Sequence, residues 1–230
     1  MRIGIDIDDT MADTFDYLMP YIAEFFKIDI NYLKDNNISY SNLPKEMKEK
    51  EFEFAKKYYD NVIPKTPFKP KVGEYIDKIK NLGNEIIIIT ARDKRLYTDE
   101  YKTTIEELKD NNINYDKIIC DFDKAKVCKN EKIDLFIDDS IENCSKVDKL
   151  GITTLLFNSK NNIRVETKLT RVNSWKEIYE KMIKKQMIDY REIKEEEKQQ
   201  VKELQEKYYD YFAQYLKDKI DEERKSKGEY

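Results

Sequence analysis

Short apolar runs alternate with segments of helical periodicity along most of the chain. The clearest run holds four consecutive isoleucines within Glu85–Ile89. Such a run is too short for a core helix and is typical of a strand that is buried on both faces. We predict strands at Arg2–Ile7, Glu85–Ile89, Lys117–Cys120, Ile133–Ile137 and Thr153–Phe157.

Between these runs, apolar residues recur at the three- and four-residue spacing of amphipathic helices. One such segment starts at Pro70 and has Gly83 just past its end, which are the positions that these residue types favour around a helix. The predicted helices are Pro70–Leu82, Tyr97–Lys109, Lys124–Asn130, Ile141–Leu150 and Trp175–Met182. This alternation predicts an α/β fold with a three-layer, doubly wound, Rossmann-like parallel sheet.

Two further predicted helices interrupt the alternation directly after the first strand. They cover Thr14–Phe26 and Lys45–Tyr59, and a polar, turn-rich stretch separates them. Prolines then mark the return to the alternating pattern. We interpret residues 14–64 as a small helical insertion into a core that is formed by residues 1–13 and 65–182.

The last part of the chain, residues 183–230, differs in composition. It has no proline, one glycine near its end and a high density of Glu and Lys. Its apolar residues recur at helical spacing: Val201, Leu204, Tyr208, Tyr211, Tyr215 and Leu216. We predict a charged amphipathic extension of one or two helices, whose apolar stripe packs on the core or on a second copy in a homodimer. Its polar face carries both signs of charge, unlike a basic helix that lies on a membrane.

The charge balance limits the classes of partner. The 43 Lys and Arg residues and the 47 Asp and Glu residues give a formal net charge of −4, which offers no electrostatic basis for binding duplex nucleic acid. We expect no membrane span, because no apolar run reaches the roughly 18 residues required, and no signal peptide. Three widely spaced cysteines, Cys120, Cys128 and Cys144, fit reduced thiols in a cytoplasmic protein.

The sequence contains no histidine. This excludes a Ser-His-Asp or Cys-His nucleophile, a histidine general base and histidine-ligated zinc. Any hydrolytic chemistry must therefore use carboxylates, lysines, hydroxyls and a metal held by oxygen ligands.

Polar residues of these types stand at or directly after the ends of four of the predicted strands. They stand in the segments Asp6-Ile7-Asp8-Asp9-Thr10, Thr90-Ala91-Arg92, Asp123-Lys124-Ala125-Lys126 and Asp138-Asp139-Ser140. Functional groups gather at the carboxyl ends of strands in open parallel sheets. Such a set suits phosphoryl transfer, in which one carboxylate attacks phosphorus, a second transfers the proton, and a hydroxyl and an ammonium hold the phosphoryl oxygens. Further carboxylates complete an oxygen site for Mg²⁺.

This constellation resembles the haloacid dehalogenase superfamily of phosphohydrolases. All four motifs occur in the superfamily's order, and the resemblance covers about residues 1–182. It implies Asp6 as the nucleophile and Asp8 as the general acid and base, with Thr90 and a lysine holding the phosphate. The implied substrate contacts come from Thr10, Ala91 and Arg92.

The resemblance also implies a metal site. The implied ligands of Mg²⁺ are Asp6, the backbone carbonyl of Asp8, and Asp138, with Asp139 close by. One departure from the superfamily's pattern is Asp9, where many members have glycine. This residue adds negative charge beside the site, and we expect its neighbours to keep their roles.

Three other segments resemble the deoxyribonucleotidase branch of this superfamily. They are Asp123-Lys124-x-x-x-Cys128, Leu155-Leu156-Phe157-Asn158 and Arg171-x-x-Ser174-Trp175. In that alignment Lys124 is the catalytic lysine, and Lys126 is the alternative. The branch implies 5′-nucleotidase activity on a nucleoside monophosphate, which is a small phosphorylated substrate, and it implies that the insertion is a cap over the active site.

Other interpretations of the same residues stay open. Asp138 and Asp139 could cap the helix that begins near Ile141, and Arg92 could sit in a surface ion pair instead of contacting phosphate. The enzyme could act on another small phosphate ester or on the 3′-phosphate end of a nucleic acid. A third hypothesis is a non-catalytic protein that binds partners through residues 183–230, and the intact set of motifs counts against it.

Overall fold

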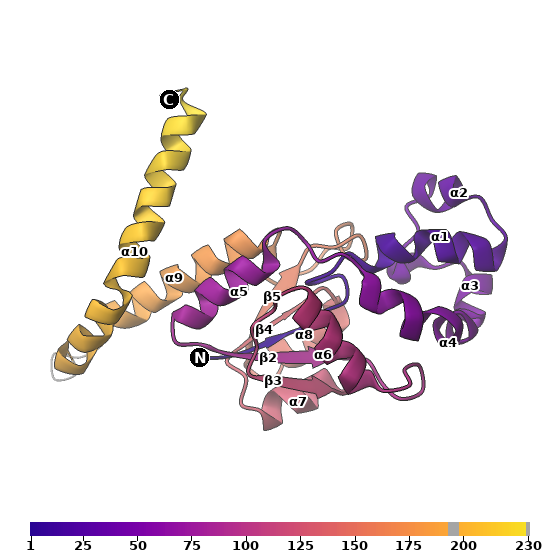
Figure 1. Cartoon of the computed structure of the whole chain (residues 1–230), viewed down its shortest axis with the longest axis horizontal. Coiled ribbons are helices and arrows are strands. Elements are labelled where there is room, and N and C mark those ends of the chain that lie inside the picture. Colours follow the sequence, from indigo (N-terminus) through magenta and orange to yellow (C-terminus); the bar gives the residue numbers. More distant parts are fainter. Residues whose placement is uncertain (193–197, 229–230) are drawn as a thin grey trace. The chain divides into compact units, whose positions relative to one another are not determined.

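The computed structural model of the protein describes residues 1–192 and 198–228. Within these residues, six parallel strands form one sheet in the order β3-β2-β1-β4-β5-β6 (Figure 1). The strands are β1 (Arg2–Ile5), β2 (Glu85–Thr90), β3 (Lys117–Cys120), β4 (Leu135–Asp138), β5 (Thr153–Phe157) and β6 (Arg171–Val172). The strand order reverses at β1, which pairs with β2 on one side and β4 on the other. Ligands of open α/β sheets bind outside the carboxyl ends of strands at such a point.

The central strands are apolar on both faces, and both faces are buried. The isoleucines from Ile86 to Ile89 in β2 have no exposed surface. In β1, a Cβ atom at Gly4 would lie 2.8 Å from Ile89 Cδ1 and 3.1 Å from Phe136 Cδ2. Glycine at this position therefore leaves room for its neighbours to pack across the strand.

Helices cover both faces of the sheet, as the alternating pattern predicts. α5 (Val72–Asn81) and α6 (Glu100–Asp110) belong to the crossovers that lead from β1 through β2 to β3. α7 (Lys124–Asn130) and α8 (Ile141–Asp148) belong to the crossovers that run back through β4 to β5. Since crossovers between parallel strands are right-handed, the two pairs of helices lie on opposite faces, which confirms the three layers.

One apolar cluster joins α7 and α8 to the sheet. Its buried members are Ile87, Ile89, Val127, Cys128, Ile133, Phe136, Cys144, Val147 and Leu156. On the other face, α5 lies beside the start of α9 (Trp175–Glu192), where the ring centroids of Tyr75 and Tyr179 are 6.0 Å apart (Figure 1).

The segment between β1 and α5 forms a helical insertion with its own core. Its elements are α1 (Thr14–Phe26), α2 (Ile30–Asp35), η1 (Tyr40–Asn42), α3 (Lys45–Glu49), α4 (Glu51–Val62) and η2 (Ile63–Lys65). The apolar cluster of this insertion includes the buried residues Phe15, Leu18, Ile22, Phe54 and Tyr58. These residues come from both of the helices that the periodicity predicts.

Several elements differ from the predictions, three of them for reasons that the local structure shows. α2 lies in a stretch that shows no helical pattern, because it is short, buries only Leu33 and depends on Asp29, which accepts a hydrogen bond from the Asn31 amide at 2.8 Å. The helix predicted at 45–59 is divided at Lys50, whose φ of −107° and ψ of 9° are not helical. β6 was not predicted, because two residues carry no detectable alternation.

The structure separates Met1–Tyr179 from a second compact unit, Glu180–Tyr230. Contrary to the predicted end at Met182, α9 continues to Glu192, and α10 (Lys198–Ser226) follows. Where the structure describes it, the extension is therefore helical, with the end of α9 and all of α10. The predicted domain boundaries at 14–64 and 183–230 stay predictions.

The apolar stripe of the extension is described only in part. The side chains of Val201 and Leu204 are not among those that the structure describes. Leu216 is 44% exposed. Homodimerisation through this stripe stays a prediction. Among the described helices, each is too short or too polar to cross a membrane.

Packing of the central sheet generates a stability prediction. Phe136 in β4 is fully buried, whereas Phe52 in α4 is 55% exposed. We expect Phe136→Ala to lower the free energy of unfolding by about 3–5 kcal/mol, because it removes apolar contacts and leaves a cavity. Phe52→Ala, the matched control, should change it by less than about 0.5 kcal/mol. Urea unfolding monitored by circular dichroism measures both, and equal losses would contradict the assignment of this core.

Candidate active site

The turn after β1 places the first acidic cluster at the carboxyl edge of the sheet. The strand predicted to reach Ile7 ends at Ile5, because the Ile7 carbonyl accepts hydrogen bonds from the next turn, including one of 2.8 Å from the Met11 amide. The Asp6 amide donates to the Ile137 carbonyl at 3.0 Å, which keeps Asp6 beside β4. Asp9 has a φ of 58°, in the left-handed region that favours glycine and tolerates aspartate.

Three buried carboxylates meet at this edge. One oxygen from each of Asp6, Asp138 and Asp139 lies within 4.8 Å of the others, and all three side chains are buried. We call these three residues the carboxylate cluster. Several anionic oxygens in one buried place are the ligands that Mg²⁺ and Ca²⁺ prefer, so the cluster fits a divalent cation. The side chain of Asp8 lies outside this group, as expected if only its backbone carbonyl binds the ion.

Lys124, the first residue of α7, reaches into the cluster. Its Nζ atom donates to Asp6 Oδ1 at 2.6 Å and to Asp138 Oδ2 at 2.8 Å. Burial works against the ammonium, but the charges of Asp138 and Asp6 outweigh it and raise the pKa of Lys124. Burial also raises the pKa of Asp6 well above its ordinary value, although Lys124 opposes that effect. Lys126, the alternative lysine, is exposed on the same helix.

Asp8 is held on a different side by a different cation. Its Oδ1 atom accepts hydrogen bonds from Thr14 Oγ1 at 3.0 Å and Arg92 Nη2 at 3.2 Å, and its Oδ2 atom lies 3.4 Å from Arg92 Nε. Arg92 is 2% exposed and also forms an ion pair with the fully buried Glu107 carboxylate. The interpretation of Arg92 as part of a surface ion pair is therefore wrong, because the pair is buried.

Asp9 and Asp139 share a network with the loop after β5. Asp9 Oδ2 accepts from Asn161 Nδ2 at 2.8 Å, and Asp139 Oδ2 accepts from Ser159 Oγ at 2.7 Å and from Asn161 Nδ2 at 3.1 Å. Burial raises the pKa of Asp9 to about 6 and that of Asp139 to about 8. The backbone amide of Tyr40 donates to Asn161 Oδ1 at 3.0 Å, so this loop also contacts the insertion.

Two hydroxyls complete the inner face of the site. Thr10 Oγ1 lies 3.4 Å from Asp6 Oδ2. Thr90 is fully buried at the end of β2, and its Oγ1 atom has no hydrogen-bond partner within the described part of the chain. An unpaired buried hydroxyl is costly, so this oxygen is available to a hydrogen-bond partner at the edge of the site. Ala91, the next residue, is half-buried.

A comparison with known families identifies the group to which this site belongs. The family model described as "5′ nucleotidase, deoxy (Pyrimidine), cytosolic type C protein" matches residues 1–188. The chain belongs to this cytosolic type C 5′-nucleotidase family. It is thus an enzyme of the haloacid dehalogenase superfamily, as the four motifs indicate.

Individual relatives agree with the family assignment. A nucleotidase of Clostridium acetobutylicum is 27% identical over 183 residues, which cover 78% of this chain and 92% of that protein. Among solved structures, a predicted phosphatase from Clostridium acetobutylicum superposes with a TM-score of 0.57 at 14% identity, covering 80% of this chain and 98% of its own. A haloacid dehalogenase-like protein from Streptococcus pneumoniae gives a TM-score of 0.56 at 14% identity, covering 79% and 97%. These structural similarities establish the fold alone.

Three residues around the nucleotidase-family site were missed from the sequence: Glu107, Ser159 and Asn161. Glu107 had a usable signal, because it lies on the buried face of α6 with Thr104 and Leu108, where an unpaired charge is rarely found. Ser159 and Asn161 had none, because they stand in a polar loop without periodicity.

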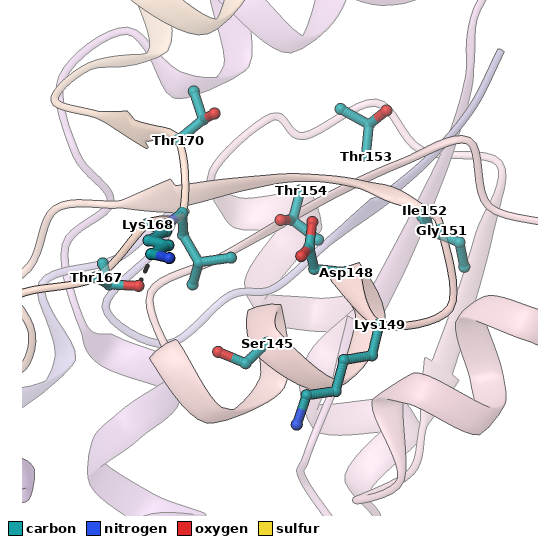
Figure 2. Close-up of a pocket in the computed structure, with 11 residues that line it drawn as sticks. Ser145, Asp148, Lys149, Gly151, Ile152, Thr153, Thr154, Thr167, Lys168 and Thr170 are labelled. Atoms are coloured by element: carbon teal, nitrogen blue, oxygen red, sulfur yellow. Dashed lines mark hydrogen bonds between the residues drawn. The ribbon is translucent and has the colours of Figure 1, made fainter.

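A cavity of about 490 Å³ lies away from this site. Figure 2 shows its lining, which includes Ser145 and Asp148 of α8, Thr153 at the start of β5, and Thr167. It is therefore at the amino end of β5, opposite the carboxyl edge that holds the four motifs. None of the predicted site residues lines it.

The contact of Lys124 with two buried carboxylates generates a prediction. In a buffer free of divalent cations, Lys124→Met should lower the free energy of unfolding by about 3–5 kcal/mol, since it leaves buried negative charge without its cation. Lys126→Met, on the exposed side of the same helix, should change it by less than about 0.5 kcal/mol. Urea unfolding of the two variants provides the measurement. A larger loss for Lys126→Met would show that the wrong lysine has been placed in the site.

Proposed function

We propose that the protein is a Mg²⁺-dependent phosphomonoester hydrolase that removes the 5′-phosphate from a nucleoside monophosphate, and the family's description supports deoxynucleotides among the candidate substrates. The observation that carries this proposal is the contact of Lys124 with both Asp6 and Asp138 at one buried edge. It supports an attacking carboxylate and a phosphate-holding ammonium side by side. The type C 5′-nucleotidase family assignment supports the choice of substrate.

In the first step, an Asp6 carboxylate oxygen attacks phosphorus and the bond from phosphorus to the nucleoside 5′ oxygen breaks. The Asp8 carboxyl group donates its proton to that oxygen, and the nucleoside leaves. The Lys124 ammonium and the Thr90 hydroxyl hold phosphoryl oxygens, and the unpaired Thr90 Oγ1 atom supports this role. The product is an aspartyl phosphate on Asp6.

In the second step, a water oxygen attacks the phosphorus of the aspartyl phosphate. Asp8, now a carboxylate, accepts the proton of that water, and the bond to Asp6 breaks to release inorganic phosphate. The Thr10 hydroxyl and the Ala91 amide are proposed to contact the substrate, and a substrate contact by Arg92 stays a prediction. When bound by Asp6, the Asp8 carbonyl, Asp138 and Asp139, Mg²⁺ would stabilise negative charge on the transferring group.

The insertion favours a small substrate, because it is tied to the core beside the site. Lys160 Nζ lies 2.7 Å from Asp16 Oδ1, and Thr98 Oγ1 donates to Asp60 Oδ2 at 2.6 Å. A cap fixed in this way excludes water and large polymeric substrates from the reacting phosphate. The free thiols of Cys120, Cys128 and Cys144 and the family's cytosolic members support a cytoplasmic location.

A panel of phosphate esters tests the reaction and its substrate. With Mg²⁺, we expect nucleoside 5′-monophosphates to be hydrolysed faster than 3′-monophosphates, sugar phosphates and oligonucleotides with a 3′-phosphate. Asp6→Asn should lower kcat at least about 10³-fold on every ester, because the nucleophile is lost. Asp148→Asn, at an exposed site on α8, is the matched control and should retain activity. Full activity of Asp6→Asn would refute the mechanism, and preference for oligonucleotide ends would refute the proposed substrate.

Binding of the metal can be measured without turnover. Mg²⁺ should stabilise the folded protein, by about 2.7 kcal/mol at a concentration 100 times its dissociation constant, because it binds only the folded carboxylate cluster. The melting temperature should rise with Mg²⁺ in the Asp148→Asn control and change much less in Asp138→Asn. EDTA should abolish hydrolysis, and restored Mg²⁺ should recover it. An equal rise in both variants would place the ion elsewhere.

A further inference from the structure

Arg92 is divided between two carboxylates, of which one faces the site and the other is sealed in the core. Nε and Nη2 of Arg92 face Asp8 at 3.4 and 3.2 Å, while Nη1 donates to Glu107 Oε2. Asp8 is 32% exposed, whereas the side chains of Arg92 and Glu107 are 2% and 0% exposed. The three groups thus form a chain from the interior of α6 to the edge of the active site.

The guanidinium has little freedom to move. The Tyr97 ring packs against it, with the centroid 5.7 Å from Arg92 Cζ, and Tyr97 is itself buried. Glu107 holds Nη1 of the planar guanidinium, so Nε and Nη2 on its other side meet Asp8 in one orientation. Asp8 receives its other hydrogen bond from Thr14, the first residue of α1.

Stability alone does not explain a charge at residue 107. Its neighbours on the buried face of α6 are Thr104 and Leu108, and one oxygen of Glu107 has no hydrogen-bond partner within the described residues. A buried ion pair is often no more stabilising than apolar side chains of the same volume, because both charges must be removed from water. An apolar residue at position 107 could not hold the Arg92 guanidinium in its orientation toward Asp8.

We propose that Glu107 and Arg92 are positioning residues, which hold the Asp8 carboxyl group for proton transfer to and from the ester oxygen. This inference rests on the proposed function, in which Asp8 is the general acid and base. Proton transfer requires hydrogen-bond distance to the reacting oxygen, and displacement of a catalytic group by about 1 Å can cost about 10²-fold in rate. Glu107 acts through Arg92 and touches no substrate.

The dependence of kcat/KM on the leaving group distinguishes a positioning role from a merely structural one. A nucleoside 5′ oxygen must be protonated as it leaves, whereas p-nitrophenolate leaves as a stable anion. The value of kcat/KM reports the first step, so it depends on the acid for the nucleotide but hardly for p-nitrophenyl phosphate. The second step needs Asp8 as a base with either ester.

The central variant is Glu107→Leu, which keeps the volume and removes the partner of Arg92. We expect kcat/KM for the best alkyl phosphate of the panel to fall about 10²-fold, with a change below about threefold for p-nitrophenyl phosphate. For p-nitrophenyl phosphate, the second step should become slow because it still needs Asp8 as a base. Both kcat and KM should therefore fall together, and a burst of p-nitrophenolate should precede the steady state. Asp8→Asn should show the same selectivity, and Asp8→Asn/Glu107→Leu should be no slower than Asp8→Asn.

Two further variants separate positioning from loss of structure. Leu108→Ala removes the adjacent, fully buried side chain of α6 and should destabilise the protein without selective loss on the alkyl ester. Glu107→Gln keeps an acceptor for Arg92 and should recover most of the activity. If Glu107→Leu does not fold, Arg92→Lys replaces it, because a single ammonium cannot hold both carboxylates in one orientation.

The inference would be overturned if Glu107→Leu lowered kcat/KM equally for both esters, or if it kept full activity. It would also be overturned if the effects of Asp8→Asn and Glu107→Leu were additive in the double variant. These outcomes differ from a failure of the proposed function, which would show itself as activity retained in Asp6→Asn. With Asp6→Asn inactive and Glu107→Leu unselective, the reaction stands and the positioning role does not.

Discussion

The contact of the Lys124 ammonium with the Asp6 and Asp138 carboxylates is the interaction on which the site depends. All three side chains are almost fully buried, so each has lost most of its hydration. Such desolvation is tolerated only where opposite charges meet with good geometry. Here that geometry comes from the sheet, because β1 and β4 are adjacent and α7 begins at the same carboxyl edge. A shift of β1, β4 or α7 would leave a buried charge without its partner.

Two neighbouring acidic residues have been given separate electrostatic surroundings. Asp6 lies in the carboxylate cluster with Lys124, while Asp8 lies at its margin with Arg92 and remains partly exposed. In the proposed mechanism, the attacking carboxylate must lie close to the metal and the phosphate, whereas the proton carrier must reach both the leaving oxygen and water. The turn that follows β1 separates these two environments over a distance of two residues, and a different cation stabilises each.

The loop after β5 connects the site with the insertion. Asn161 contacts Asp9 and Asp139 through its amide nitrogen and the Tyr40 backbone through its oxygen. The position of the insertion is therefore linked to a residue of the carboxylate cluster through one side chain. In the opposite direction, Thr14 at the start of the insertion contacts Asp8. The insertion therefore contacts the acidic motifs through two separate sets of hydrogen bonds, one at Asn161 and one at Thr14.

The sequence by itself determined the order of the strands and helices and the positions of the acidic motifs. Hydrophobic periodicity is a local property, and strand ends with functional residues are visible without knowledge of packing. It could not decide between Lys124 and Lys126, because both lie in the first turn of the same helix and only the direction of α7 relative to the sheet buries one of them. The helical pattern placed Glu107 on a buried face without showing that Arg92 is its partner, and nothing in the sequence identified Asn161 as the partner of Asp9 and Asp139, since it stands in a polar loop with no motif. Those contacts were decided by the tertiary structure alone, because burial and the approach of separate elements determine which polar groups must pair with one another.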